Sequence, residues 1–155
     1  MSLRMRALYQ LASVYWRLVQ PVTLGVQAML IRNEQILLVR HSYRPGWCLP
    51  GGGVDRNETL ETAVRRELHE EIRATPRTLA LFGIYTNTNG HKSDHITLFL
   101  SEDFEWQPNY RTAEIAEARL FPLQALPPAA DLDKGVQRRV HTYVNGRSWP
   151  EHNTW

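Results

Sequence analysis

The sequence predicts one mixed α/β domain. The chain has 155 residues, 43% of them hydrophobic and 10% aromatic, which is enough to bury a core of its own. Short apolar segments of strand-like composition are separated by turn residues, and a helical pattern directly follows three consecutive glycines at 51–53. The sequence contains no repeat, linker or low-complexity tract that would indicate a second domain.

Five segments are expected to be strands. Each is rich in aliphatic, β-branched or aromatic residues and is bounded by turn residues. The first two flank a short turn at 32–34, so we expect them to form a β-hairpin. The five segments are 22–31, 35–40, 78–86, 95–100 and 118–122.

Two helices are expected beside these strands. From residue 59 onward, apolar residues fall on one side of a helix, and no Pro or Gly interrupts the run before Pro76. Residues 131–145 have the same spacing and are closed by Gly146.

Charge and cysteine content restrict the class of protein. The formal net charge of +2 is too balanced to indicate nucleic-acid binding, and no nucleic-acid partner is expected. The single cysteine, Cys48, excludes an internal disulfide and a multi-cysteine zinc site, so we expect a reducing compartment, the cytoplasm. No apolar run approaches the roughly 20 residues that cross a bilayer.

The acidic residues are concentrated in one place. Six of the 16 acids lie between residues 55 and 71, next to the glycines. At about 100° per residue, Glu67 and Glu71 project within roughly 40° of each other and share an arc with Glu70 and the apolar side. Carboxylates that converge there repel one another and resist desolvation, and a divalent cation such as Mg²⁺ or Mn²⁺ removes both difficulties. The alternative is a solvated helix face held by pairs such as Arg66 with Glu70.

The same segment resembles the Nudix box, the signature of the MutT-like Nudix hydrolase family. That signature requires a glycine, five residues, a glutamate, seven residues and then Arg-Glu-aliphatic-x-Glu-Glu. The matching positions are Gly52, Glu58, Arg66, Glu67, Leu68, Glu70 and Glu71. Two later positions depart, because the final glycine is Arg73 and the final aliphatic residue is Ala74. Arginine is poorly suited to end a helix as glycine does, so we expect the turn after Ile72 to be displaced.

The likeness extends over residues 22–127 and implies an α/β/α sandwich with a mixed β-sheet. We therefore assign residues 21–146 to a Nudix hydrolase domain and 147–155 to a C-terminal tail. The resemblance implies that water hydrolyses a nucleoside diphosphate linked to another group, a small-molecule substrate, with Mg²⁺ or Mn²⁺ as cofactor. The arrangement of Arg40, Trp47 and the following glycines is also similar to that of nucleoside triphosphate pyrophosphohydrolases.

The resemblance also implies roles for individual residues. By position in the motif, the metal ligands are the carbonyl of Gly51 and the carboxylates of Glu67, Glu70, Glu71 and, further downstream, Glu114. Glu117 is the alternative to Glu114. The catalytic residues are Glu67 as general base, Arg66 as the group that orients it, and Glu70. Glu58 is expected to hold the loop and the helix together.

Substrate contacts are expected around the glycine turn. Arg40 and Arg44 are suited to phosphate, although an arginine at a strand end is often simply solvated. Trp47 and Tyr85 have rings that can stack on a base, although such aromatic residues are as often part of the core. The predicted substrate-binding residues are Arg40, Arg44, Trp47, Gly52, Gly53 and Tyr85. Cys48 is expected to be buried and inert.

Two other functions are compatible with such a domain. A non-catalytic module of the same fold would sense a nucleotide or dock a partner, but it would be expected to lose the glutamates that this chain keeps. Isopentenyl diphosphate isomerisation would need a dedicated cysteine and further acidic residues in a larger chain. Hydrolysis is therefore the favoured function.

Residues 1–20 are expected to form an amphipathic helix. Its polar residues recur every three or four positions and leave a narrow polar stripe, and Pro21 stops the pattern. We expect the apolar remainder to pack against the domain or against a second subunit of a homodimer. Contact with a membrane surface through Tyr15, Trp16 and the arginines is the alternative.

Deletion of residues 1–20 tests this docking. Because buried apolar area contributes about 25 cal/mol per Å², the truncated protein should lose thermal stability or dissociate from a dimer to a monomer. Thermal unfolding and light scattering measure the two effects. Unchanged stability and unchanged mass would contradict the docking, and loss of liposome binding on truncation would favour the membrane contact instead.

Overall fold

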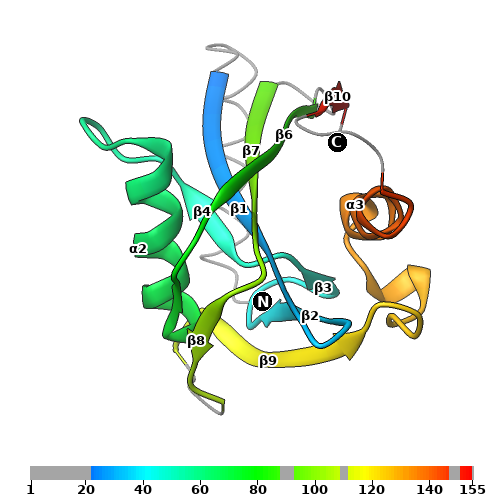
Figure 1. Ribbon diagram of the computed structural model, residues 1–155. Helices are drawn as coiled ribbons and strands as arrows, with labels where there is room; N and C mark the ends of the chain where they lie inside the picture. The colour runs from blue at the N-terminus through cyan, green and yellow to red at the C-terminus, as the bar shows by residue number, and fades with distance from the viewer. Residues whose placement is uncertain (1–21, 88–92, 109–111, 147–150, 155) are drawn as a thin grey trace, which may run out of the picture.

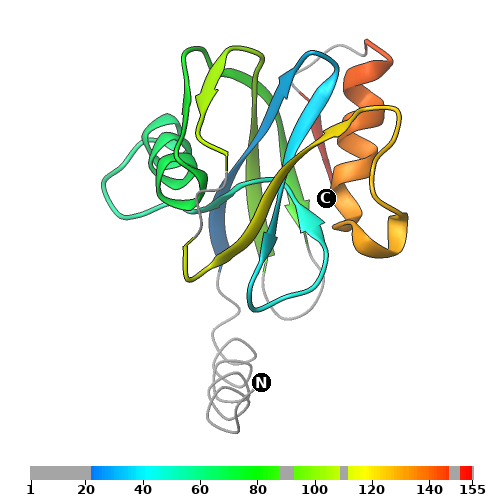
Figure 2. The same ribbon diagram turned by 90° about the horizontal axis from the view of Figure 1, so that it is seen from below.

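The computed structural model describes residues 22–87, 93–108, 112–146 and 151–154. A mixed β-sheet lies between two helices, α2 (Leu60–Ile72) on one face and α3 (Lys134–Val144) on the other (Figures 1 and 2). The predicted α/β/α sandwich is thereby confirmed. The strands are β1 (Val22–Arg32), β2 (Gln35–His41), β3 (Trp47–Cys48), β4 (Gly51–Gly53), β5 (Ala74–Pro76), β6 (Ala80–Asn87), β7 (Ser93–Ser101), β8 (Phe104–Trp106), β9 (Ile115–Pro122) and β10 (Glu151–Thr154).

Strand β1 organises the sheet. It runs parallel to β7 from Val22 to Leu30 and antiparallel to β4 from Gly25 to Gln27. It then turns into β2, with Ile31 opposite Ile36, so the predicted hairpin is confirmed. The full order is β10-β6-β7-β1-β2-β3, with β4 added to β1 and β9 added to β2.

The remaining predicted strands are all present, although their ends differ from the predicted ones. The structure also contains strands that were not predicted. Strand β9 begins at Ile115 because it pairs with β2 along the whole length of that strand. The expected tail at 147–155 was wrong in part, since 151–154 form β10, which pairs parallel with β6 at the edge of the sheet. An edge strand leaves backbone groups open for such pairing. The short pair β5 and β8 was not predicted.

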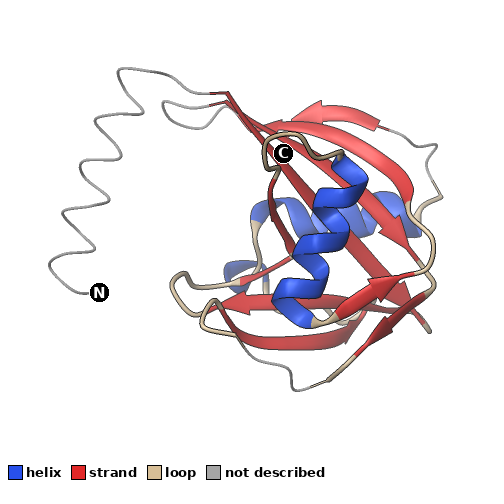
Figure 3. Cartoon of the chain, turned by 90° about the vertical axis from the view of Figure 1, so that its left-hand side faces the viewer, coloured by secondary structure: helices blue, strands red, loops and turns tan. Residues whose placement is uncertain are grey.

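The sheet separates two apolar clusters. Along β1, Val26, Ala28 and Leu30 belong to the cluster under α2, whereas Met29 and Ile31 belong to the cluster under α3. This is the alternation of a strand that is covered on both faces. Each helix contributes its apolar stripe, and Figure 3 shows α2 lying across the strands. The position of α2 is therefore fixed by buried apolar contacts.

Helix α2 ends where the family pattern would end it. Thr59 caps its start by accepting a hydrogen bond from the N–H of Thr62 at 3.1 Å. Arg73 follows Ile72 in the left-handed conformation, with φ 53° and ψ 37°, and its N–H donates to the carbonyl of His69 at 3.1 Å. The expected displacement of the helix end was therefore wrong: the arginine adopts the backbone conformation that glycine takes most easily.

Some predictions lie outside the described residues. The amphipathic helix at 1–20 and most of the expected tail are among them. Within the described ranges, no helix is both long and apolar enough to cross a membrane.

Replacement of Arg73 by glycine should stabilise the protein. The left-handed conformation costs a side-chain-bearing residue roughly 1–2 kcal/mol, and Arg73→Gly removes that cost. Arg73→Ala is the matched control, because it removes the same contact with His69 but keeps the β-carbon. Urea unfolding should rank the glycine variant above the alanine variant by about 1 kcal/mol. Equal stabilities would show that the conformation of Arg73 is not strained.

Candidate active site

Two of the three glycines, Gly51 and Gly52, let strand β4 lie close to β1 and α2. A β-carbon on Gly51, whose φ is +137°, would lie 2.2 Å from the carbonyl oxygen of Val26. A β-carbon on Gly52 would lie 2.6 Å from the carboxylate of Glu67. At Gly51 the obstacle is backbone, so glycine is required there, whereas at Gly52 a side chain would displace the carboxylate of Glu67.

Glu71 is the buried carboxylate of this contact. Its side chain accepts a hydrogen bond from the N–H of Gly51 at 2.9 Å, and the residue is only 6% exposed. The pKa of Glu71 is raised to about 7, chiefly by burial; the hydrogen bond from Gly51 and the charge of Arg44 oppose the rise, and the charges of Glu67 and Glu114 add to it. A negative charge at this position is therefore only partly compensated by the protein itself.

Arg66 ties the glycine loop to the helix. Its guanidinium donates to Glu58 at 2.7 Å, to Glu67 at 2.8 Å and to the carbonyl of Gly53 at 3.0 Å. Glu58 in turn accepts from the N–H of Asp55 at 2.6 Å, which gives Glu58 the holding role expected of it. The guanidinium thus restricts the orientation of the Glu67 carboxylate.

A cavity of about 470 Å³ opens beside these groups. Seven of the residues proposed from the sequence line it, namely Arg44, Gly51, Gly52, Gly53, Glu67, Glu71 and Glu114. The sequence did not indicate the nine further wall residues, which come from β1, β7, the end of β2 and the loop after it: Thr23, Leu24, Gly25, Val26, Gln27, His41, Tyr43, Asp94 and Ile96. The cavity therefore reaches from the carboxylates of α2 across β1 to β7.

Five of the predicted site residues do not line the cavity, namely Arg40, Trp47, Arg66, Glu70 and Tyr85. Glu70 has a side chain that is 61% exposed and that binds Arg66 at 3.3 Å. Arg40 forms an ion pair with Glu117 at 2.6 Å and lies over the ring of Trp47. Glu117 is thus engaged away from the carboxylates, which favours Glu114 as the downstream acid.

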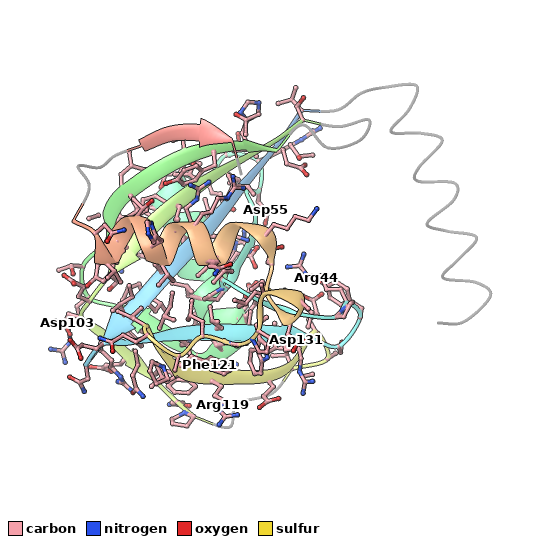
Figure 4. All side chains as sticks on the ribbon, turned by 90° about the vertical axis from the view of Figure 1, so that its right-hand side faces the viewer. Arg44, Asp55, Asp103, Arg119, Phe121 and Asp131 are labelled. Atoms are coloured by element: carbon pink, nitrogen blue, oxygen red, sulfur yellow. The ribbon has the colours of Figure 1, made fainter. Side chains whose placement is uncertain are left out.

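Trp47 packs against neighbouring side chains of the fold. Its ring packs against Phe121 with a centroid distance of 4.8 Å, and Arg119 lies over that phenylalanine. Figure 4 shows Arg119 and Phe121 together on β9, and Arg44 apart from them in the loop after β2. Trp47 lines a smaller cavity of about 130 Å³ with Arg44 instead.

The prediction that Tyr85 contacts the substrate was wrong. The residue is fully buried in the cluster under α3, and the guanidinium carbon of Arg139 lies 3.4 Å from the centre of its ring. Both of its ring faces are therefore removed from the cavity. Cys48 is buried as expected, and burial raises its pKa to about 11, so the thiol stays protonated and inert at neutral pH.

The residues at this site suit a divalent cation of the magnesium type. In the part of the chain that is described, no three acidic, histidine or cysteine side chains form a group that would hold a metal ion by themselves. Mg²⁺ needs no such cage, because it keeps several waters and binds through one or two carboxylates and the phosphates of a substrate. Glu67, Glu71 and Glu114 line one wall of the cavity, and a cation would offset the repulsion that raises the pKa of Glu71.

The comparisons with known proteins identify the family. The model of the NUDIX domain matches residues 22–143, and the chain belongs to this family. An ADP-ribose pyrophosphatase from Methanocaldococcus jannaschii is 29% identical over 135 residues, which are 84% of this chain and 80% of that protein. A putative 8-oxo-dGTP diphosphatase from Bacillus subtilis is 37% identical over 68 residues, which are 44% of this chain and 46% of that protein.

The solved structures agree with this assignment. A MutT NUDIX hydrolase from Burkholderia pseudomallei superposes with a TM-score of 0.69 at 26% identity and covers 78% of this chain and 97% of that one. The protein is therefore a hydrolase that acts on pyrophosphate bonds of nucleoside diphosphate derivatives. Enzymes of this family generally use divalent metal ions.

The metal-free protein should lose stability as the pH rises. Because the pKa of Glu71 is about 7 in the folded protein, the folded state binds more protons than the unfolded chain between the ordinary value of 4.5 and 7. Stability should fall across that window by an amount of order 3 kcal/mol, and then level off. Thermal unfolding in chelator between about pH 4 and about pH 8 measures the effect.

Glu71→Gln should flatten this dependence, because the amide does not titrate. Glu61→Gln, on the exposed side of the same helix, is the matched control and should keep the slope. A slope that is identical in all three proteins would show that Glu71 is not the group responsible.

Proposed function

We propose that the protein hydrolyses the diphosphate linkage of a nucleoside diphosphate joined to a second group, in a reaction that requires Mg²⁺ or Mn²⁺. The observation that carries this proposal is the cavity that Glu67, Glu71 and Glu114 line together with Arg44. Acidic groups for cations and a basic group for phosphate are the two requirements of pyrophosphate chemistry.

The metal would be held by the carboxylates of Glu67, Glu70, Glu71 and Glu114 and by the carbonyl of Gly51. When bound, such ions neutralise phosphate charge and lower the pKa of a coordinated water. Glu70 is the outermost of these ligands, since its side chain is 61% exposed and extends toward solvent beside Arg66.

The protein side chains orient the substrate and move the proton. Arg44 lines the cavity, and a nitrogen of its guanidinium lies 3.2 Å from the sulfur of Cys48. This contact fixes the direction of the arginine, and its charge is suited to the oxygens of a diphosphate. Glu67 is the proposed general base. Burial raises its pKa, and its hydrogen bond to Arg66 at 2.8 Å opposes the rise and holds the carboxylate in one orientation.

ADP-ribose is the first substrate to test. The relative that aligns along 84% of this chain is named an ADP-ribose pyrophosphatase, whereas the relative named a putative 8-oxo-dGTP diphosphatase aligns over 44%. Nucleoside triphosphates are the second class, on the resemblance around Arg40 and Trp47. A panel that also contains nucleotide sugars and dinucleoside polyphosphates, assayed with each metal, identifies the substrate.

Loss of the helix carboxylates should abolish most of the activity. Glu70→Gln and Glu71→Gln should each lower turnover at least roughly 100-fold, equivalent to about 2.7 kcal/mol of transition-state stabilisation. Glu61→Gln is the matched control on α2, because Glu61 pairs with Arg65 outside the cavity. Circular dichroism verifies that the variants are folded.

Removal of the metal should have the same effect in the unmodified protein. Exhaustive chelation should eliminate hydrolysis, and added Mg²⁺ or Mn²⁺ should restore it. Full activity in chelator, or near-normal rates in both glutamine variants, would contradict the proposed metal site.

A further inference from the structure

Tyr43 is an exposed aromatic residue on the wall of the carboxylate cavity. It lies in the loop between β2 and β3 and is 61% exposed, although it is a large and partly apolar side chain. It belongs to neither of the two apolar clusters. Its ring also borders a second cavity of about 480 Å³ on the same loop, so it stands where the two cavities meet. The packing of the core therefore does not explain this ring.

The ring of His41 contacts the ring of Tyr43. The two ring centres are 5.0 Å apart with an angle of 38° between the planes, and His41 is 93% buried, since 7% of it is exposed. Burial, and then the charge of Arg44, lower the pKa of His41 to about 4, so the imidazole is neutral at neutral pH. A neutral ring in tilted contact with Tyr43 limits the movement of the tyrosine ring on that side without adding charge.

The buried nitrogen of His41 has no role in the hydrogen bonding of the described structure. Its Nδ1 atom is buried and finds no hydrogen-bond partner among the described residues. Burial of such an atom without a hydrogen bond is unfavourable, and no hydrogen bond of that atom within the described residues offsets the cost. What the imidazole does provide is a ring that contacts Tyr43 at a tilted angle.

The other aromatic candidates are occupied elsewhere. Trp47 is covered by Arg40 and packs on Phe121, and Tyr85 is buried beneath Arg139. Among the described residues that line the cavity, His41 and Tyr43 are the aromatic rings.

We propose that Tyr43, supported by His41, is the stacking platform for the nucleobase of the substrate. This inference rests on the proposed function, because it concerns the same cavity. Arg44, the next residue along the chain, lines the same cavity as the carboxylates, so a base on Tyr43 leaves the attached diphosphate near the basic group and the proposed metal ligands. Stacking recognises the flat face that every base has, so the platform selects for a nucleotide rather than for one particular base.

Two probes that differ only in the base test the platform. AMP and ribose 5-phosphate have the same phosphate and sugar, and calorimetry compares their affinities in the presence of Mg²⁺. The unmodified protein should bind AMP more tightly. Tyr43→Ala should weaken AMP roughly 10-fold, which corresponds to about 1.4 kcal/mol, and should leave ribose 5-phosphate within about twofold, because it removes a base contact alone.

Matched variants separate the ring from the fold. Tyr43→Phe keeps the ring and should retain the AMP affinity, whereas Tyr43→Leu keeps apolar bulk and should behave like the alanine variant. His41→Phe preserves a ring beneath Tyr43 and should bind AMP normally, whereas His41→Ala should weaken it. Thermal unfolding of each variant verifies the fold.

Three results would overturn the platform. One is equal binding of AMP and ribose 5-phosphate to the unmodified protein, another is normal AMP affinity in Tyr43→Ala, and the third is an equal loss for both probes. Hydrolysis by Tyr43→Ala at saturating substrate and metal is measured in parallel. Metal-dependent hydrolysis that persists while the AMP test fails would reject the platform and keep the proposed function. Absence of hydrolysis in the unmodified protein would reject that function.

Discussion

The structure depends on one contact, in which the buried carboxylate of Glu71 meets the glycine backbone of β4. Strand β4 approaches β1 so closely that Gly51 has no room for a β-carbon, a β-carbon on Gly52 would displace the carboxylate of Glu67, and the N–H of Gly51 reaches Glu71. The apolar stripe of α2 holds the helix in place, so this contact cannot be relaxed by moving the helix away. The fold therefore maintains a carboxylate whose charge the protein only partly compensates. A divalent cation completes the compensation, which links the packing of the domain to the chemistry proposed for it.

The parts of the site that follow from local spacing could be predicted from the sequence. Helical periodicity places Glu67 and Glu71 on one arc, and the family motif adds Arg66 and the glycines. The hairpin between β1 and β2 also depends on neighbouring residues only. The exception at short range is Arg73, where residue preference indicated a displaced helix end. The buried contacts of α2 and the hydrogen bond to His69 outweighed that preference.

The parts that depend on distant pairing could not be predicted. Alternation along β6 is broken by a register shift between Leu81 and Gly83, and as a result Phe82 and Tyr85, an odd number of positions apart, enter the same cluster. Strand β10 occupies the edge of the sheet, where it pairs with the side of β6 that β7 leaves open. The placement of Tyr43 beside the carboxylates requires β4 to pair with β1 and β2 to pair with β9, and a single sequence contains no local signal for either pairing.

Proton release on metal binding measures the coupling between the buried carboxylate and the cation directly. Because metal ligands must be deprotonated, Mn²⁺ that binds at a site containing protonated Glu71 releases a proton. Calorimetric titration of Mn²⁺ at about pH 6, in buffers of different ionisation enthalpy, gives the number of protons released. We expect about one proton from the unmodified protein and close to none from Glu71→Gln. Tight Mn²⁺ binding to the unmodified protein without proton release would contradict the account.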